Sequence, residues 1–448
     1  MNKGTSKAEK KQDSWQLEEK CWRFLQPFLE QLHGLVDRRI VKTFLDLVMV
    51  ILMHRNRNNG LLLSELGDHL LGGERGPAGV KRIASLLHSV KWESKLILDY
   101  LWKKADQRVK ELGKQKDDVY VIWDESVLEK SESLKAEGLC AVRSTKAARL
   151  KRIKPGYFNP PTNRPIFVPG INWLQLLVTG MKGTPILAHL GWWTTRGEKA
   201  SQKREEEGKI LKKVLKLWGR KVIHIWDRGF AGSPWTTLAL EHHLRFILRW
   251  NKNYHLIGPD GRKHEAWKIS HGKRSWEYRM FSDARRRCHR KTGVIAFPIH
   301  LPEDLRQLFL VVSRPGYGRK PWYLITSEPV HNAAQAWNII FAYARRWQIE
   351  MSLRFTKSEM AFESPRLIQW EARLKFLLIA SLAYAFLLSL LPDPDFLLAF
   401  ISRYCHRTGK WSRETSAPLY RLRLAISRLW LLFRPHSLPT LISGGAMF

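Results

Sequence analysis

Cysteine is scarce in this sequence, and acidic residues are few for the number of basic ones. The four cysteines of the 448 residues stand far apart and form no Cys-x2-Cys pair. This spacing argues against a zinc site and gives no indication of a disulfide framework. Isolated thiols fit a reducing compartment, so we expect a cytoplasmic protein.

The chain also lacks a long hydrophobic run. The longest, residues 376–391, has 16 residues, which is short beside the roughly 20 that a membrane-spanning helix needs. The first residues are polar and rich in lysine and lack the apolar core of a signal peptide. We therefore expect a buried core helix at 376–391 and no membrane partner; a transmembrane segment is the less favoured interpretation.

The imbalance of charge is the strongest feature of the composition. Against 76 Lys and Arg stand only 41 Asp and Glu, which gives a formal net charge of +35. An excess of this size indicates a polyanionic partner, nucleic acid first and an anionic membrane surface second. Double-stranded DNA is the partner that we expect.

The N-terminal part of the chain shows helical periodicity. A helix is predicted at residues 61–71, a turn at 76–79 and a basic helix at 80–90. This order resembles a helix-turn-helix reader of DNA. Because most such helix pairs only pack on each other, DNA contact by Lys81 and Arg82 and a purely structural role are both open. We assign residues 1–115 to a helical N-terminal DNA-binding region.

After residue 116 the pattern changes to strands alternating with helices, which predicts an α/β core. Residues 119–123 form a β-branched and aromatic run that ends at Asp124, and residues 221–226 form a similar run that ends at Asp227. Each run predicts a buried strand with a carboxylate at its C-terminal end. A cap or turn residue is the ordinary interpretation of each aspartate alone, but the repetition favours a paired role.

A single long helix is predicted from residue 332 onward, with four functional side chains. Tyr343, Arg346, Glu350 and Lys357 are spaced by 3, 4 and 7, so they fall on one face. A solvated polar face is the ordinary interpretation. The flanking residues are bulky and apolar, however, and a buried carboxylate needs a cation or a metal.

The pattern Tyr-x2-Arg-x3-Glu-x6-Lys resembles the signature of bacterial insertion-sequence transposases of the DDE type, cut-and-paste elements. The resemblance implies a ribonuclease-H-like catalytic core interrupted by a β-rich insertion. The expected division of the chain is 116–250 for the first part of the core, 251–321 for the insertion, 322–392 for the second part of the core and 393–448 for a basic helical C-terminal region.

The resemblance also implies roles for residues. Asp124, Asp227 and Glu350 would hold two Mg2+ ions, with Mn2+ able to substitute, for phosphodiester cleavage. The other implied residues would bind DNA: Tyr343, Arg346, Lys357, Trp322, Trp347 and Arg228. Trp322 falls where relatives with a hairpin intermediate hold a flipped base; a core tryptophan on a strand is an equal interpretation.

The function expected from these residues is a DNA transposase. It would bind its terminal inverted repeats, cleave the ends through a hairpin and join the 3′-OH ends to target DNA. The resemblance implies a homodimer that bridges two ends, associated with the bacterial nucleoid. Two alternatives remain at this stage, namely a ribonuclease-H-like endonuclease specific for branched DNA and a catalytically silent DNA-binding descendant.

Overall fold

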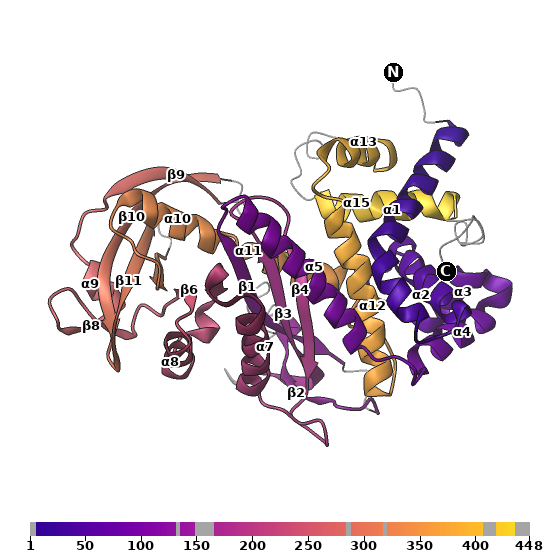
Figure 1. Cartoon of the computed structure of the whole chain (residues 1–448), viewed down its shortest axis with the longest axis horizontal. Coiled ribbons are helices and arrows are strands. Elements are labelled where there is room, and N and C mark those ends of the chain that lie inside the picture. Colours follow the sequence, from indigo (N-terminus) through magenta and orange to yellow (C-terminus); the bar gives the residue numbers. More distant parts are fainter. Residues whose placement is uncertain are drawn as a thin grey trace.

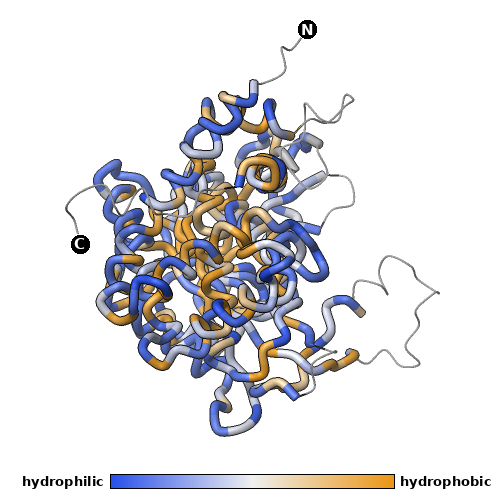
Figure 2. The backbone as a smooth tube through the Cα atoms, turned by 90° about the vertical axis from the view of Figure 1, so that its right-hand side faces the viewer, coloured by the Kyte–Doolittle hydropathy of each residue, from blue (hydrophilic) through white to orange (hydrophobic). Residues whose placement is uncertain are grey.

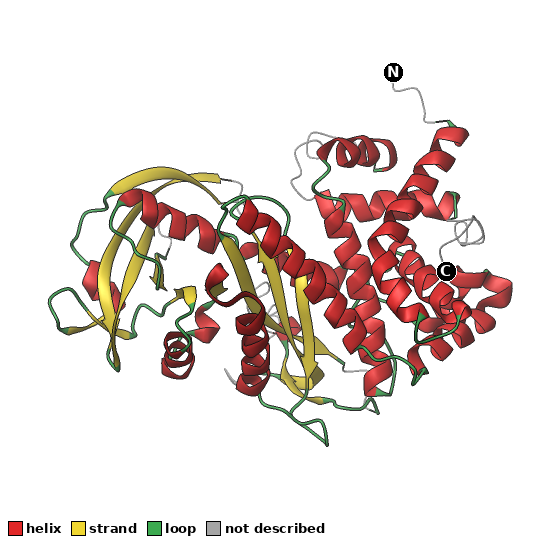
Figure 3. Cartoon of the chain, viewed as in Figure 1, coloured by secondary structure: helices red, strands yellow, loops and turns green. Residues whose placement is uncertain are grey.

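The computed structural model of the chain describes residues 6–130, 135–147, 165–283, 288–316, 320–405 and 418–434. A large mixed sheet with its helices lies beside a bundle of helices formed by the two ends of the chain (Figures 1 and 3). Hydrophobic segments gather in the interior and hydrophilic ones at the periphery (Figure 2). The fold is therefore mixed α/β with one large sheet.

The helical bundle begins at the N-terminus. Its first helix starts at Lys7 because Ser6 and Glu9 form a capping box that satisfies the first backbone N–H groups. The helices before the sheet are α1 (Lys7–His33), α2 (Arg38–Met53), α3 (Leu63–Leu71), α4 (Gly76–His88) and α5 (Lys95–Lys114).

Helices α3 and α4 form the predicted helix-turn-helix pair, but the turn lies earlier than expected. It occupies the segment from Gly72, at a φ of +94°, to Arg75, and Gly76 already begins α4. The two helices touch through glycines: a Cβ added at Gly79 would lie 2.2 Å from the carbonyl oxygen of Gly67. The turn predicted at 76–79 was wrong because Pro77 sits in the first turn of α4, where a missing N–H costs nothing.

The sheet has 12 strands among the described residues, in the order β2-β3-β1-β5-β6-β12-β11-β10-β7-β8, with β4 on β3 and β9 on β10. Strands β1, β5 and β6 are parallel, and β3 and β12 flank them in the antiparallel direction. The strands of the first half are β1 (Val119–Glu129), β2 (Cys140–Arg143), β3 (Phe167–Thr179), β4 (Ile186–Trp193), β5 (Val222–Trp226) and β6 (Arg245–Arg249). Those of the second half are β7 (His255–Ile257), β8 (Lys263–Glu265), β9 (Glu277–Asp283), β10 (Cys288–Leu301), β11 (Asp304–Pro315) and β12 (Trp322–Thr326).

Each face of the sheet has its own apolar core. Side chains alternate along a strand, so Ile122 and Ile225 face one core while Trp123 and Trp226 face the other. Helices α10, α11 and α12 cover the first face, whereas α7 and α8 contribute to the second. The helices after β4 are α7 (Lys203–Trp218), α8 (Ser233–Glu241), α9 (Ala266–Ser270), α10 (Ala333–Ala344), α11 (Trp347–Ser358), α12 (Trp370–Ser389), α13 (Pro394–Tyr404) and α15 (Pro418–Leu432).

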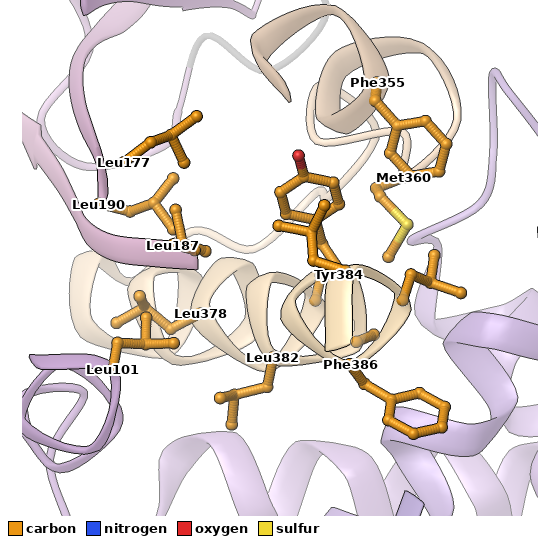
Figure 4. Close-up of a cluster of buried hydrophobic side chains, with 14 of the residues drawn as sticks. Leu101, Leu177, Leu187, Leu190, Phe355, Met360, Leu378, Leu382, Tyr384 and Phe386 are labelled. Carbon is orange, nitrogen blue, oxygen red and sulfur yellow. The ribbon is translucent and has the colours of Figure 1, made fainter. Parts of the chain in front are cut away.

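Helix α12 is the centre of the molecule. It is long and apolar enough to cross a membrane, but 89% of its most apolar window is buried inside the protein, as expected for a core helix. Figure 4 shows Leu190 of β4 and Phe355 of α11 on one side of α12, and Phe386 turned to the other side, where its ring contacts Phe24 of α1. The helix thus joins the sheet to the bundle.

The segment 251–321 is rich in strands, and it extends the same sheet. Strand β11 pairs with β12, which pairs with β6. The strands of residues 251–321 therefore belong to the same sheet as the core strands. At the other end of the chain, α13 and α15 pack against each other. Residues 406–417 and 435–448, which belong to the predicted basic C-terminal region, lie outside the described residues.

Two histidines predict how stability depends on pH. His224 is fully buried and His189 is partly buried, and burial lowers the pKa of each to about 3. The unfolded chain takes up their protons below about pH 6.5 while the folded protein does not, so the free energy of unfolding falls as pH decreases. Each should contribute about 1.4 kcal/mol per pH unit.

We expect His189→Gln to make the free energy of unfolding less dependent on pH, because one proton fewer is taken up on unfolding. Urea unfolding at pH 7 and pH 5 measures it, and His242→Gln, at an exposed position, is the control. An unchanged pH slope in His189→Gln would contradict the prediction.

Candidate active site

The parallel register of β1 and β5 sets the two aspartates beside each other. Ile122 pairs with Ile225, and Asp124 and Asp227 each follow two positions later along their strands. Both therefore point to the sheet face that α10, α11 and α12 cover. Their tryptophan neighbours point to the opposite face and pack there with Trp235.

The sequence predicts that the strand ends at Asp124, but in the structure it continues past this residue. Strand β1 continues to Glu129, because β3 pairs with it antiparallel along this whole stretch and places Gln175 opposite Asp124. The backbone at Asp124 is thus held by β3, whereas β5 pairs with β1 only over the residues from Val119 to Ile122. Asp227, by contrast, follows the end of β5, where its carboxylate accepts a hydrogen bond from the N–H of Gly229 at 2.6 Å.

The predicted continuous helix after residue 332 is two helices. α10 ends at Ala344 and α11 begins at Trp347. Between them, the N–H groups of Arg345 and Arg346 donate to carbonyls three residues back, a tighter turn than an α-helix makes. Arg345 is held there by Thr179 of β3, whose hydroxyl oxygen accepts a hydrogen bond of 2.8 Å from the Arg345 guanidinium. Contacts with the sheet therefore place the break.

Arg346 links two of the three predicted acids. Its Nη1 lies 3.5 Å from Oδ2 of Asp124, and its Nη2 forms an ion pair with Oε1 of Glu350. The arginine side chain is only 14% exposed, so water screens these interactions little. An acid from β1 and an acid from α11 are thereby brought to one cation.

The pKa of Asp124 is affected by both of the other predicted acids, Asp227 and Glu350. Burial, together with the charges of Asp227 and Glu350, raises the pKa of Asp124 to about 7, against the opposing charge of Arg346. Burial is the largest cause of this shift, and the two neighbouring carboxylates add to it. Asp227 and Glu350, which are far from Asp124 in the sequence, therefore lie near enough to act on its charge.

The donor chemistry of this cluster fits a hard divalent cation, since carboxylate oxygens are the ligands that Mg2+ prefers. Among the described residues, no three Asp, Glu, His or Cys side chains already stand close enough together to hold an ion. In this structure two of the three carboxylates, those of Asp124 and Glu350, pair with the guanidinium of Arg346.

A cavity of about 300 Å³ opens beside Asp227, and it is lined mainly by cationic and polar groups. Its lining residues are Asp227, Arg228, Gly229, Arg249, Tyr343 and Arg346. Burial raises the pKa of the Tyr343 phenol, which therefore stays protonated. Arg249 had not been singled out in the sequence; its position at the end of β6, next to β5, is the signal that could have indicated it.

Lys357 faces a second cavity, of about 340 Å³. Burial lowers the pKa of Lys357, and the acids Glu363, Glu129 and Asp124 partly oppose that shift. The cavity is lined by Arg57, Asn58, Asn59, Leu62, Glu129, Lys130, Lys146, Lys357, Glu363, Ser364 and Arg366. The four residues of the predicted helical face are thus divided, with Tyr343 and Arg346 at one cavity and Lys357 at the other.

The remaining predicted residues lie around this centre or away from it. Trp322 is half-buried on β12, with its ring edge-on to Tyr343 at a centroid distance of 5.2 Å. Trp347 is half-buried at the start of α11. Lys81 and Arg82 are exposed on α4, which packs mainly on α2, α3 and α12, so they are separate from the carboxylates.

Comparison with known proteins adds independent information. Residues 168–386 match the family model described as a transposase DDE domain. The match contains Asp227 and Glu350 and begins after Asp124, and it supports a DDE transposase. Among solved structures, the chain is similar to a piggyBac transposase synaptic complex with hairpin DNA, at 11% identity and a TM-score of 0.40, over 91% of this chain and 75% of that chain. No curated protein matches it.

Ser352, two residues after Glu350, anchors α11 to the sheet, and its replacement should lower stability. Ser352 on α11 accepts a buried hydrogen bond of 2.6 Å from Nε2 of Gln175 on β3. Ser352→Ala leaves that amide buried without its partner, which should cost about 1–3 kcal/mol. Thermal unfolding measures the loss, and Ser358→Ala is the matched control, because its hydroxyl only bonds back to Arg354 of the same helix at an exposed position. Equal effects of the two substitutions would contradict this assignment.

Proposed function

We propose that the protein is a DNA transposase of the DDE type that cleaves the ends of its own element and joins them to target DNA. The observation that carries the proposal is the convergence of Asp124, Asp227 and Glu350 around Arg346. The match of residues 168–386 to a transposase DDE domain supports the same function.

The fold that we infer for the catalytic part is ribonuclease-H-like. Strands β4-β3-β1-β5-β6 have three parallel members preceded by an antiparallel meander, and the acids lie on one face of the central strands. In open sheets of this kind, ligands bind at the carboxyl ends of the parallel strands. The end of β5, where Asp227 stands, is such a place.

Two Mg2+ ions, or Mn2+ in their place, would be held by Asp124, Asp227 and Glu350. Bound there, they would activate the attacking oxygen and stabilise the leaving oxygen of an in-line displacement at phosphorus. The protein supplies one carboxylate on β1, one directly after the end of β5 and one on α11. The placement of these three groups sets the line along which a phosphodiester must lie.

The cationic side chains around the acids suit the DNA backbone. Arg228, Arg249 and Arg346 line the cavity at Asp227, and a guanidinium can bind a phosphate through two parallel hydrogen bonds. Tyr343 adds a hydroxyl there, and Lys357 with its cavity adds a second cationic position. We propose that these residues hold phosphates on either side of the bond to be cut.

The rest of the chain would supply binding to double-stranded DNA. The net charge of +35 and the exposed Lys81 and Arg82 on the second helix of the α3–α4 pair support end recognition by the helical region. A homodimer would bridge the two ends in the bacterial cytoplasm. We further propose a hairpin intermediate, with Trp322 stacking on a flipped base beside the cut and Trp347 contacting the DNA.

The first test concerns the acids. Asp124→Asn, Asp227→Asn and Glu350→Gln each remove a charge that a metal requires, so each should abolish Mg2+-dependent cleavage of end DNA while end binding persists. The expected loss is at least about a thousandfold, the scale of removing a central electrostatic group in a catalytic site. Asp117→Asn, at an exposed position before β1, is the matched control.

The same assay separates this function from its rivals. Strand transfer with pre-cut ends distinguishes a transposase from a nuclease that joins nothing. Cleavage retained by Glu350→Gln would refute the role of the acids.

The second test concerns Trp322. Trp322→Ala removes the stacking surface, so hairpin formation should fall by at least about tenfold while first-strand nicking changes little. Denaturing gels of end DNA cleaved by the protein resolve the two products. Equal loss at both steps would mean that Trp322 acts through packing against Tyr343.

A further inference from the structure

An aromatic and cationic surface lies on the added strands, apart from the carboxylates. Trp276, directly before β9, and Tyr278 and Met280 of β9 occupy alternate positions and are 45%, 56% and 63% exposed. Lys291 of β10 pairs with Met280 and is exposed. We call these four residues the β9 platform. β9 runs along the margin of the molecule above α10 (Figure 1), and among the described strands it pairs only with β10.

The opposite face of β9 is already occupied. Phe281 stacks on Trp337 and Phe341 of α10, and Arg279 lies over the Trp337 ring at 5.5 Å while it pairs with Glu277. Because side chains alternate along a strand, the β9 platform is the face that α10 leaves uncovered. Its exposure follows from the register of the strand.

Further along β10 the same face is covered. Ile295 of β10 is buried in one cluster with Ile269 of α9. The cover stops before Gly293, which pairs with Tyr278. The β9 platform is thus the open end of a sheet face whose remainder is packed as core.

Tyr278 is held in place by its neighbours. A Cβ added at Gly293 would lie 2.8 Å from Cε1 of the tyrosine ring and 2.5 Å from Oγ of Ser275, so the ring rests directly on the glycine backbone. The amino group of Lys291 lies over the same ring, 5.3 Å from its centroid. The ring of Tyr278 therefore rests on the backbone of Gly293 at its inner side and has a cation over it.

The surroundings are cationic. Lys273 and Arg274, just before Trp276, are exposed, and Arg314, which pairs with Gly293, donates to the carbonyl groups of Ser270 and Lys273. No Asp or Glu occupies the described positions of β9 and β10 on this face, because Glu277 alternates to the other side. Exposed aromatic rings among uncompensated cations are what a nucleic acid strand needs for stacking and phosphate contact.

We infer that the β9 platform binds an unpaired DNA strand, with bases stacked on Trp276 and Tyr278 and phosphates near Lys291, Lys273 and Arg274. A duplex hides the faces of its bases, whereas a single strand offers them to aromatic rings. This binding needs no metal and no cleavage, so it does not depend on the proposed function of the carboxylates.

The experiment measures binding of a fluorescent oligothymidylate and of a duplex by anisotropy, with the full chain in EDTA. Trp276→Ala/Tyr278→Ala should weaken single-strand binding by at least about tenfold and duplex binding by much less. Trp276→Phe/Tyr278→Phe should retain most of the affinity, because phenylalanine still stacks. Lys291→Met should lower the slope of log affinity against log salt by about 0.7.

Leu305→Ala is the matched control, since Leu305 is an 88% exposed apolar residue on β11 of the same segment. Thermal unfolding checks that each variant is folded. Single-strand affinity unchanged in the alanine pair, or lost equally in Leu305→Ala, would overturn the inference. So would a changed sedimentation coefficient at unchanged DNA affinity, because the β9 platform would then be an interface with a second copy of this chain.

Discussion

The arrangement of the centre depends on the parallel pairing of β1 with β5. That register sets Asp124 and Asp227 at equivalent positions on adjacent strands, and packing of α11 on β1 and β3 brings Glu350 over them. Like charges do not gather without a compensating cation. Arg346, at the junction of α10 and α11, is that cation in this structure. The break between the two helices therefore has a chemical consequence: it sets a guanidinium at the edge of the acid cluster.

Helix α11 is held at both ends of its functional segment. Near Glu350, Ser352 bonds to Gln175 of β3. At its C-terminal cap, the carboxylate of Glu359 is fully buried and pairs with Arg55 and Arg57 of the segment after α2. Removing either partner of such a pair leaves a buried charge uncompensated. The helical region at the N-terminus thus does more than surround the sheet, because its two arginines fix the end of the helix that presents Glu350 and Lys357.

Much of this was predictable from local patterns. The apolar runs before Asp124 and Asp227 predicted two buried strands. Three features were not, and each has a nonlocal cause. Pairing with β3 extends β1 past Asp124; contacts of Arg345 with the sheet break the long helix; and the cavity at Lys357 takes residues 57–59 from a segment some 300 positions away. Arg249 was missed for the same reason, since only the strand order sets β6 beside β5.

The raised pKa of Asp124 reports on its surroundings, which are burial, two other carboxylates and one guanidinium. Burial raises the pKa of Asp124 to about 7, with the charges of Asp227 and Glu350 adding to the rise and Arg346 opposing it, so this carboxyl group binds a proton more readily than a free aspartate does. A divalent cation bound by these oxygens must displace that proton, which makes metal affinity depend on pH through Asp124. The raised pKa thus reflects a carboxyl group that is held out of water next to two other carboxylates. Arg346 opposes that rise with its positive charge but does not cancel it.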